Sequence, residues 1–203
     1  MAPILPGATV GFLGGGQLGR MAAMAARSLG YGVAVLDPDP RCAASFVSDK
    51  CITASFDDAA AAEELARASA VVTYEIEKVS ATSAEAASRY APVRPSPQIL
   101  AMVQDRGSQK RWLTEHGLPV GPYREVNDPK EVAIAVRELG VPCRLKTRRG
   151  GYDGRGQARL TAEADITRAW GSAGGASAVI EHELTLEAEL SVLVARSPSG
   201  QLA

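Results

Sequence analysis

The sequence has few of the residues that build disulfide scaffolds, metal centres or membrane spans. Of its 203 residues only three are cysteines and two are histidines. The cysteines, at positions 42, 51 and 143, are odd in number and form no CxxC spacing, which disfavours a disulfide framework and a zinc site. No run approaches the roughly 20 apolar residues of a membrane-spanning helix, and the first residues lack the basic region of a secretory signal. We therefore expect a cytoplasmic protein with no membrane partner.

An excess of charge of one sign is also missing. The chain has 22 Lys and Arg against 23 Asp and Glu, for a formal net charge of −1. That balance disfavours a protein that coats nucleic acid. With 46% hydrophobic and 22% charged residues, the composition is typical of a globular protein, and the length suits one large domain or two small ones.

Short apolar runs alternate with helical patterns, which predicts βα units around a mostly parallel sheet. The strands are expected over residues 8–13, 33–36, 50–53 and 70–74. Helices are expected at about 17–29, after Asp57 or Asp58, and at about 81–89. These elements predict an α/β domain over residues 1–96.

The stretch PVRPSP at 92–97 is a stiff connector and predicts the first domain boundary. Beyond it we expect helices from Pro97 and up to His116, and another after Asp128, where an N-cap acid precedes a proline. Strands are also expected over residues 143–147, 157–160, 177–182 and 188–195, and a helix over 162–170. Only three residues follow the turn at 197–200, so the last strand has no partner and the chain is expected to be truncated.

A first glycine loop lies between the first expected strand and the first expected helix. Its sequence GGGQLGR, from Gly14, matches GxGxxG: Gly14 permits the tight turn, Gly16 lets a ligand approach the backbone, and Gly19 allows close helix packing. The helix N-terminus favours an anion. Asp37, at the end of the second strand, could receive a ribose hydroxyl, so an NAD(P)-dependent oxidoreductase is one hypothesis and a purely structural turn another.

A second glycine segment, from Lys146 to Gln157, joins two strands through four glycines. Glycines at this density leave successive N–H groups free to bind one oxyanion, and no Gly-Lys-Ser/Thr of a Walker A loop follows. Period-two alternation places Arg144 and Lys146 on one face of the preceding strand and Cys143 and Leu145 on the other. The combination predicts phosphate binding.

Five stretches occur together and in order: GFLGGGQLGRM, LDPDP, RPSP with the following QDR, LKTRRGGYDGRGQ, and VIE with ELSV. Together they resemble the 5-(carboxyamino)imidazole ribonucleotide synthase family of purine biosynthesis, within the ATP-grasp superfamily. The resemblance runs from Val10 to about Ser197. It implies a Rossmann-like pre-ATP-grasp domain (1–96) followed by an incomplete ATP-grasp domain, made of the small subdomain (97–176) and the start of the second (177–203).

The resemblance implies an ATP-dependent carbon–nitrogen ligase. In the family, ATP and bicarbonate give carboxyphosphate, and the carboxyl group passes to the exocyclic amine of aminoimidazole ribonucleotide, with ADP and phosphate released. Mg²⁺ is an implied cofactor whose ligands are expected in a C-terminal part absent here, so no metal ligand is assigned in this chain. The family is commonly a homodimer, and we expect this chain alone to be inactive.

The resemblance also implies roles for single residues. Lys146, Asp153 and Arg155 are the expected catalytic residues. Nucleotide contacts are expected from Arg106, Lys146, Gly151, Tyr152, Asp153, Gly154, Arg155, Gly156, Gln157, Glu181, His182, Glu183, Leu184 and Glu189. Among these, Glu181 and the Leu184 backbone would meet adenine, and Glu189 would hold the ribose. Contacts with aminoimidazole ribonucleotide are expected from Gly16, Gln17, Leu18, Glu75, Tyr152 and Arg155, with Asp153 also near the imidazole.

Three rival functions stay open at this point. One is another ATP-grasp ligase, such as a biotin carboxylase or a formate-dependent ribonucleotide transformylase. The second is the NAD(P)-dependent oxidoreductase, which leaves the second glycine segment unexplained. The third is a binding module without catalytic activity.

Overall fold

The computed structural model describes residues 3–151, 156–197 and 199–203. Its contacts divide the chain into two compact units, the first of residues 4–118 with 148–150 and the second of residues 119–147 with 151–203. The first unit holds a parallel sheet with helices and the second an antiparallel sheet with helices, which confirms the predicted α/β class. The three-part division at 97 and 177 stays a prediction.

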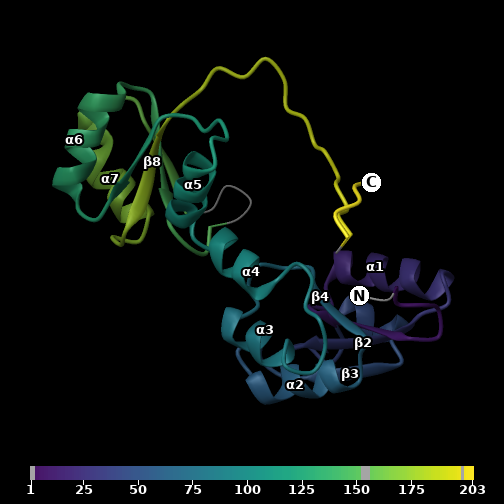
Figure 1. The fold of residues 1–203 in the computed structure, drawn as a ribbon. Coiled ribbons are helices and arrows are strands. Elements are labelled where there is room, and N and C mark those ends of the chain that lie inside the picture. Colours follow the sequence, from purple (N-terminus) through teal and green to yellow (C-terminus); the bar gives the residue numbers. More distant parts are fainter. Residues whose placement is uncertain (1–2, 152–155, 198) are drawn as a thin grey trace. The chain divides into compact units, whose positions relative to one another are not determined.

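The first unit is built on a four-stranded parallel sheet in the order β3-β2-β1-β4 (Figure 1). Its strands are β1 (Thr9–Leu13), β2 (Gly32–Asp37), β3 (Lys50–Thr53) and β4 (Val71–Tyr74). Its helices are α1 (Gln17–Ser28), the short 3₁₀ helix η1 (Ala43–Val47), α2 (Ala59–Arg67), α3 (Ala81–Ala87), α4 (Pro97–Val103) and α5 (Arg106–Glu115).

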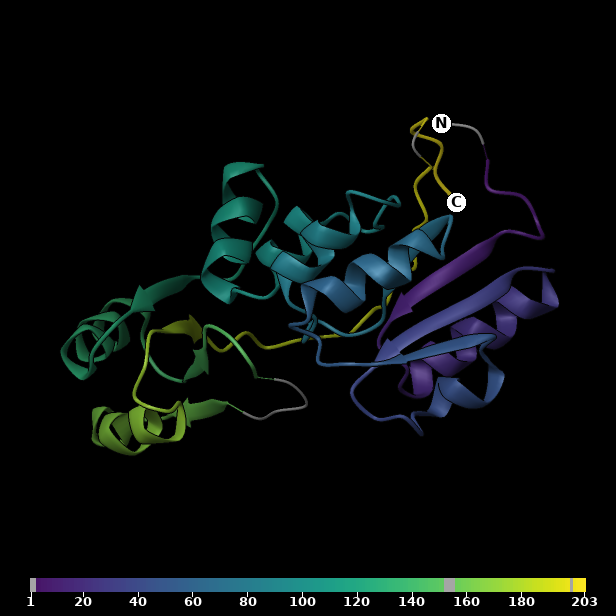
Figure 2. The same ribbon diagram turned by 90° about the horizontal axis from the view of Figure 1, so that it is seen from below.

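Both faces of this sheet are covered, as expected for a parallel sheet (Figure 2). On one face, α1 and η1 pack against Phe12, Val33 and Val35. On the other face, α2 and α3 enclose a core that includes Leu13, Leu36, Leu65 and Val72. Because the core residues of α2 and α3 are mostly alanines, these helices lie close to the strands and to each other.

Side-chain caps begin most of the longer helices. Asp58, one of the two acids predicted to cap this helix, accepts from the Ala61 amide at 3.0 Å and so starts α2. Asp128 accepts from the Glu131 amide at 2.8 Å, where the predicted helix α6 (Pro129–Leu139) begins. Asp105 caps α5 in the same way.

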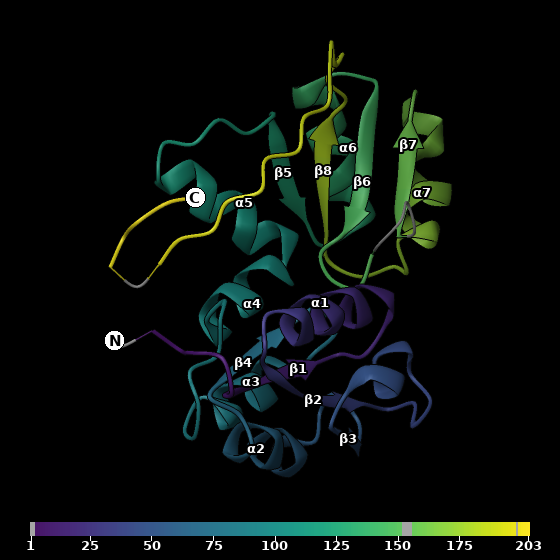
Figure 3. The same cartoon turned by 90° about the vertical axis from the view of Figure 1, so that its right-hand side faces the viewer.

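The second unit is built on a four-stranded antiparallel sheet in the order β5-β8-β6-β7 (Figure 3). Its strands are β5 (Tyr123–Val126), β6 (Cys143–Thr147), β7 (Gln157–Leu160) and β8 (Ala178–His182), and its remaining helices are η2 (Glu163–Asp165) and α7 (Ile166–Ser172). Helices α6 and α7 share a core with Leu145, Leu160 and Ile180 on one face of this sheet.

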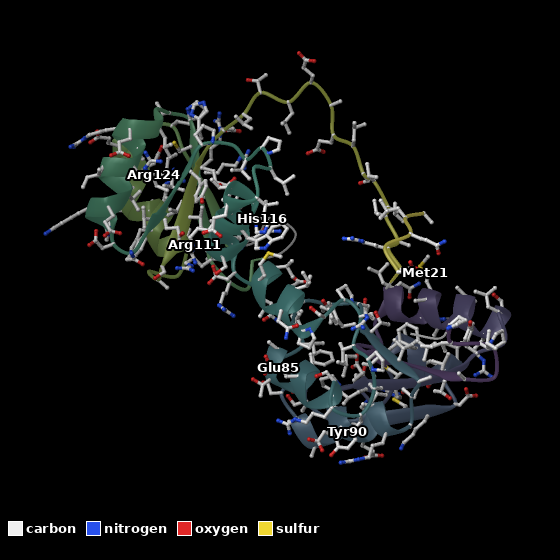
Figure 4. The ribbon with its side chains drawn as sticks, in the orientation of Figure 1. Met21, Glu85, Tyr90, Arg111, His116 and Arg124 are labelled. Atoms are coloured by element: carbon white, nitrogen blue, oxygen red, sulfur yellow. The ribbon has the colours of Figure 1, made fainter. Side chains whose placement is uncertain are left out.

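Two strand predictions failed. Strand β5 was missed because the sequence YREV is short and half charged, and Arg124, labelled in Figure 4, bonds Glu138 of α6 at 2.8 Å rather than packing in the core. The strand predicted over 188–195 is wrong, since the structure has no strand there and Leu190 and Leu193 are 89% and 91% exposed. Alternating apolar residues form a strand only where a neighbouring strand accepts their hydrogen bonds.

Within the described ranges, no helix combines the length and the apolar character needed to cross a bilayer.

Leu65→Ala should destabilise the first unit by about 2–5 kcal/mol, because the Leu65 side chain is fully buried in the core under α2 and its removal leaves a cavity. Urea denaturation followed by circular dichroism measures the effect. The matched variant Leu29→Ala, at a position 66% exposed, should change the midpoint little. Equal effects of the two variants would contradict this picture of the core.

Candidate functional site

The first glycine loop is held by hydrogen bonds to its own backbone amides. Gly14 has a φ of +104°, a conformation that other residues rarely adopt, and its amide donates to the Leu36 carbonyl at 2.9 Å. The amides of Gly15 and Gly16 donate to the carboxylates of Asp37 at 2.8 Å and Glu75 at 3.1 Å. Side-chain carboxylates therefore accept from both amides, including that of Gly16, where the sequence predicts the approach of a ligand.

Close packing explains why two further glycines stand in this loop. A Cβ on Gly15 would collide with the Cys42 sulfur and lie 2.9 Å from Cγ1 of Val35. A Cβ on Gly19 would lie 2.7 Å from the Gly14 carbonyl oxygen, so only glycine lets α1 start against the loop. This agrees with the predicted packing role of Gly19.

Asp37 has a different role from the one that the oxidoreductase hypothesis gave it. One carboxylate oxygen accepts from the Gly15 amide, and the other accepts from the Asp39 amide at 2.9 Å. Both oxygens are thus engaged by backbone groups of the same chain. Asp37 therefore holds the loop in place. It shares only its position at the end of the second strand with the ribose-binding acid of a dinucleotide-binding protein.

The structure brings together two of the residues predicted to bind aminoimidazole ribonucleotide. Glu75 follows β4 and lies beside Gly16, so that a Cβ on Gly16 would approach Oε1 of Glu75 to 2.7 Å. Gln17 and Leu18, in the first turn of α1, are both exposed. Their contacts with the substrate stay predictions.

The second unit carries a polar face on its antiparallel sheet, opposite the face that α6 and α7 cover. In the strand register Arg144 lies opposite Glu181, and Lys146 lies opposite Gln157 of β7. The ammonium of Lys146 lies 3.0 Å from Oε2 of Glu181, with 27% and 17% of the two side chains exposed. The predicted alternation along β6 is confirmed, since Cys143 and Leu145 are fully buried on the other face.

Glu183 joins two arginines of this face. Its carboxylate accepts from Arg144 at 3.0 Å and from Arg159 at 2.6 Å. The hydrogen bond from Arg159 lowers the pKa of Glu183, whereas burial raises it. The hydrogen bond from Arg144 and the positive charges of both arginines lower it further, so the pKa lies below its ordinary value. Glu183 therefore fixes cations in place, a role that the sequence did not indicate.

The second glycine segment is closed by a bond between its two ends. The Thr147 amide donates to the Gly156 carbonyl at 2.8 Å, and Gly150 and Gly156 have φ values of +75° and +67°. Both values require glycine or strain. The predicted roles of Tyr152, Asp153, Gly154 and Arg155 fall on residues outside the described ranges.

Arg148, the third residue of this segment, belongs to the first unit and is bonded there to the N-terminus of α5. Arg148 donates to Oδ1 of Asp105 from Nε at 3.0 Å and from Nη2 at 2.8 Å. Its carbonyl accepts from the amide of Arg106 at 2.9 Å. The predicted phosphate ligand Arg106 thus lies one backbone hydrogen bond from Arg148, two residues after Lys146.

The predicted adenine-binding stretch is divided between the two faces of the sheet. His182 pairs with Cys143 on the covered face, so its side chain lies away from Glu181, and its buried Nδ1 has no hydrogen-bond partner among the residues that the structure describes. Leu184 packs against Gly121, where a Cβ would lie 3.2 Å from Cδ1 of Leu184. Glu189 is exposed and lies in the stretch without a strand.

A parallel sheet with a glycine loop, followed by an antiparallel sheet whose polar face carries a lysine beside a glycine segment, defines an ATP-grasp protein with its preceding domain. Residues 7–104 match the ribonucleotide synthetase preATP-grasp domain, and residues 111–203 match the ATP-grasp domain. The chain belongs to the N5-carboxyaminoimidazole ribonucleotide synthase family.

Three relatives illustrate the similarity. The N5-carboxyaminoimidazole ribonucleotide synthase of Brucella melitensis is 42% identical over 200 residues, which are 98% of this chain and 55% of that protein. The Staphylococcus aureus N5-carboxyaminoimidazole synthetase complexed with ADP has 35% identity and a TM-score of 0.93, covering 98% of this chain and 53% of its own. The Aspergillus clavatus enzyme, in complex with ADP and 5-aminoimidazole ribonucleotide, has 33% identity and a TM-score of 0.80, covering 89% and 47%.

The chain thus spans about half the length of the relatives that it matches.

Gly15→Ala should destabilise the first unit by about 1–3 kcal/mol, because the added methyl group overlaps the Cys42 sulfur. The double variant Gly15→Ala/Cys42→Ala should recover part of the loss. Gly171→Ala is the control, since no atom of the described residues would lie within 4 Å of a Cβ there. Thermal unfolding of all four proteins measures the effect, and no recovery in the double variant would contradict the assigned contact.

Glu183 should titrate below a free glutamate, and Arg159→Gln should raise its pKa, because the Arg159 bond is the largest cause of the shift. Because the pKa of Glu183 is lower in the folded state than in the unfolded state, its ionised carboxylate stabilises the fold at pH values above the unfolded-state pKa. This stabilisation is lost as the pH falls through the folded-state pKa. Carboxyl NMR titration measures it. An unchanged pKa in the variant would refute the assignment.

Proposed function

We propose that the whole protein catalyses the ATP-dependent carboxylation of 5-aminoimidazole ribonucleotide with bicarbonate, giving N5-carboxyaminoimidazole ribonucleotide, ADP and phosphate. The single observation that carries the proposal is the Lys146–Glu181 pair on the polar sheet face, beside a glycine segment, in a chain of this family. Three crystal structures of two relatives contain ADP or ATP, and one of the three also contains the ribonucleotide, which supports the choice of ligands.

Each of these residues has its own role in the proposed reaction. Lys146 and Arg106 bind the nucleotide phosphates, and fixed cations of this kind stabilise charge on a phosphoryl group in transfer. Gly151, Gly156 and Gln157 flank the phosphates. The bicarbonate oxygen attacks the terminal phosphorus, ADP leaves, and the amine of the ribonucleotide then attacks the carboxyl carbon of carboxyphosphate while phosphate leaves.

Glu181 has two roles in this proposal. It holds the ammonium of Lys146 at 3.0 Å from its Oε2, which keeps a long, flexible side chain on the polar face. It also accepts from the adenine amine, with the Leu184 backbone against the ring and Glu189 at the ribose. Glu183 contributes by holding Arg144 and Arg159 beside the same site.

The aminoimidazole ribonucleotide is proposed to bind at the first glycine loop, near Gly16, Gln17 and Leu18. Glu75 then accepts from the ribose hydroxyls. The remaining predicted contacts, from Tyr152, Asp153 and Arg155, belong to the same proposal.

Magnesium is implied by the family, and the residues described do not provide for it. Within 3–151, 156–197 and 199–203, no three His, Cys, Asp or Glu side chains gather to hold a metal ion. No step above is therefore assigned to the metal, whose ligands we expect in the part of the relatives that this chain does not span. A homodimer and a cytoplasmic location belong to the proposal for the whole protein.

Lys146→Met should lower the affinity for ATP at least tenfold, because it removes the cation that meets the phosphates. Isothermal titration of the folded chain measures the dissociation constant, with Lys50→Met as control, since Lys50 pairs with Glu64 on the exposed surface. Unchanged affinity in Lys146→Met would overturn the proposed nucleotide site and favour a binding module.

We expect this chain alone to show negligible phosphate release that depends on both 5-aminoimidazole ribonucleotide and bicarbonate. Rapid turnover would show that the site is complete without further residues. Screening phosphate release from a complete protein with other acceptors of carboxyl groups would separate this reaction from those of other ATP-grasp ligases.

A further inference from the structure

Asp105 is the one charged residue that is buried among the residues described, with 7% of its surface exposed. A buried carboxylate is costly unless it is paired and hydrogen-bonded. Here Oδ1 alone accepts three bonds, two from Arg148 and one from the Ser108 amide at 3.0 Å, and Arg149 lies 3.5 Å from Oδ2. More pairing is concentrated on this carboxylate than an N-cap needs.

These bonds connect two segments that are far apart in sequence. Asp105 is the N-cap of α5, whose first residue is Arg106, while Arg148 is the third residue of the second glycine segment. The Arg106 amide, which has no partner within its own helix, donates to the Arg148 carbonyl. We call this set of bonds between Asp105, Arg106 and Arg148 the clasp.

We propose that Asp105 is a positioning residue: through the clasp it holds Arg106 and the first residues of the glycine segment in the arrangement that receives the nucleotide phosphates. This inference rests on the proposed function for the identity of the ligand. It assigns to the acid of the QDR sequence a role of its own beside the arginine.

The pKa of Asp105 is consistent with the clasp. Burial raises it, but the Arg148 and Ser108 bonds and the charges of Arg148 and Arg149 outweigh burial, so the pKa lies below its ordinary value. Asp105 is therefore ionised at neutral pH. The stability that it contributes is present above the pKa of a free aspartate and is lost as the pH falls through the lowered value.

Substitutions at Asp105 separate the clasp from plain helix capping. Asparagine caps helices as well as aspartate does but has no charge, whereas glutamate keeps the charge and is not among the preferred caps. If the clasp is correct, Asp105→Asn should speed amide hydrogen exchange at Arg106 at least tenfold, while Asp105→Glu should stay within about threefold of the original chain. The opposite ranking would show a capping role only and overturn the proposal.

Asp58→Asn is the matched control, because Asp58 caps α2 with no arginine bonded to it among the hydrogen bonds of the described residues. It should leave exchange at Arg106 unchanged. The Val35 amide, in the central strand β2 of the same unit, serves as an internal reference for global unfolding in every variant.

A second experiment measures the binding of ATP to the same variants. Asp105→Asn should weaken ATP binding at least fivefold, whereas Asp105→Glu and Asp58→Asn should change it less than twofold. Normal ATP affinity in Asp105→Asn would overturn the positioning role. If the unsubstituted chain does not bind ATP, the proposed nucleotide site and this role fall together, while the exchange ranking still decides whether the clasp exists.

Discussion

Carboxylates that accept bonds from the chain's own backbone and arginines hold both glycine-rich segments. Asp37 and Glu75 accept from the amides of Gly15 and Gly16 in the first loop, and Asp105 accepts from Arg148 at the start of the second segment. Glycine gives a backbone the freedom to approach a ligand, and that freedom has an entropic cost. Fixed acceptors from neighbouring elements offset this cost in the first loop and at Arg148 of the second segment.

On the polar sheet face of the second unit, carboxylates likewise hold other groups in place, but here the groups that they hold are charged side chains. Three cations, Arg144, Lys146 and Arg159, share two acids, Glu181 and Glu183. The excess of positive charge suits an anionic ligand, and the acids keep the cations from separating by mutual repulsion. The hydrophobic core of this unit lies on the other face of the sheet, as is common for antiparallel sheets.

Much of the architecture could be predicted from sequence because it depends on local patterns. The four strands of the parallel sheet and the alternation in β6 follow from apolar periodicity, and α2 and α6 follow from their caps. Partners distant in sequence could not be predicted: nothing near Asp37 or Asp105 indicates that these acids accept from Gly15 and Arg148. Likewise, the apolar stretch 188–195 looks like a strand by itself, but a strand depends on a neighbour to bond with. Motif resemblance supplied the site residues, and the strand register then separated His182 from Glu181.

Glu75 also sets the electrostatic field at the start of α1. Its carboxylate, 3.1 Å from the Gly16 amide, neutralises part of the positive end of the helix dipole. A bare phosphate would meet repulsion at this amide, whereas a sugar hydroxyl can donate to the carboxylate. We therefore expect this loop to favour a ligand that presents hydrogen-bond donors over one that presents negative charge.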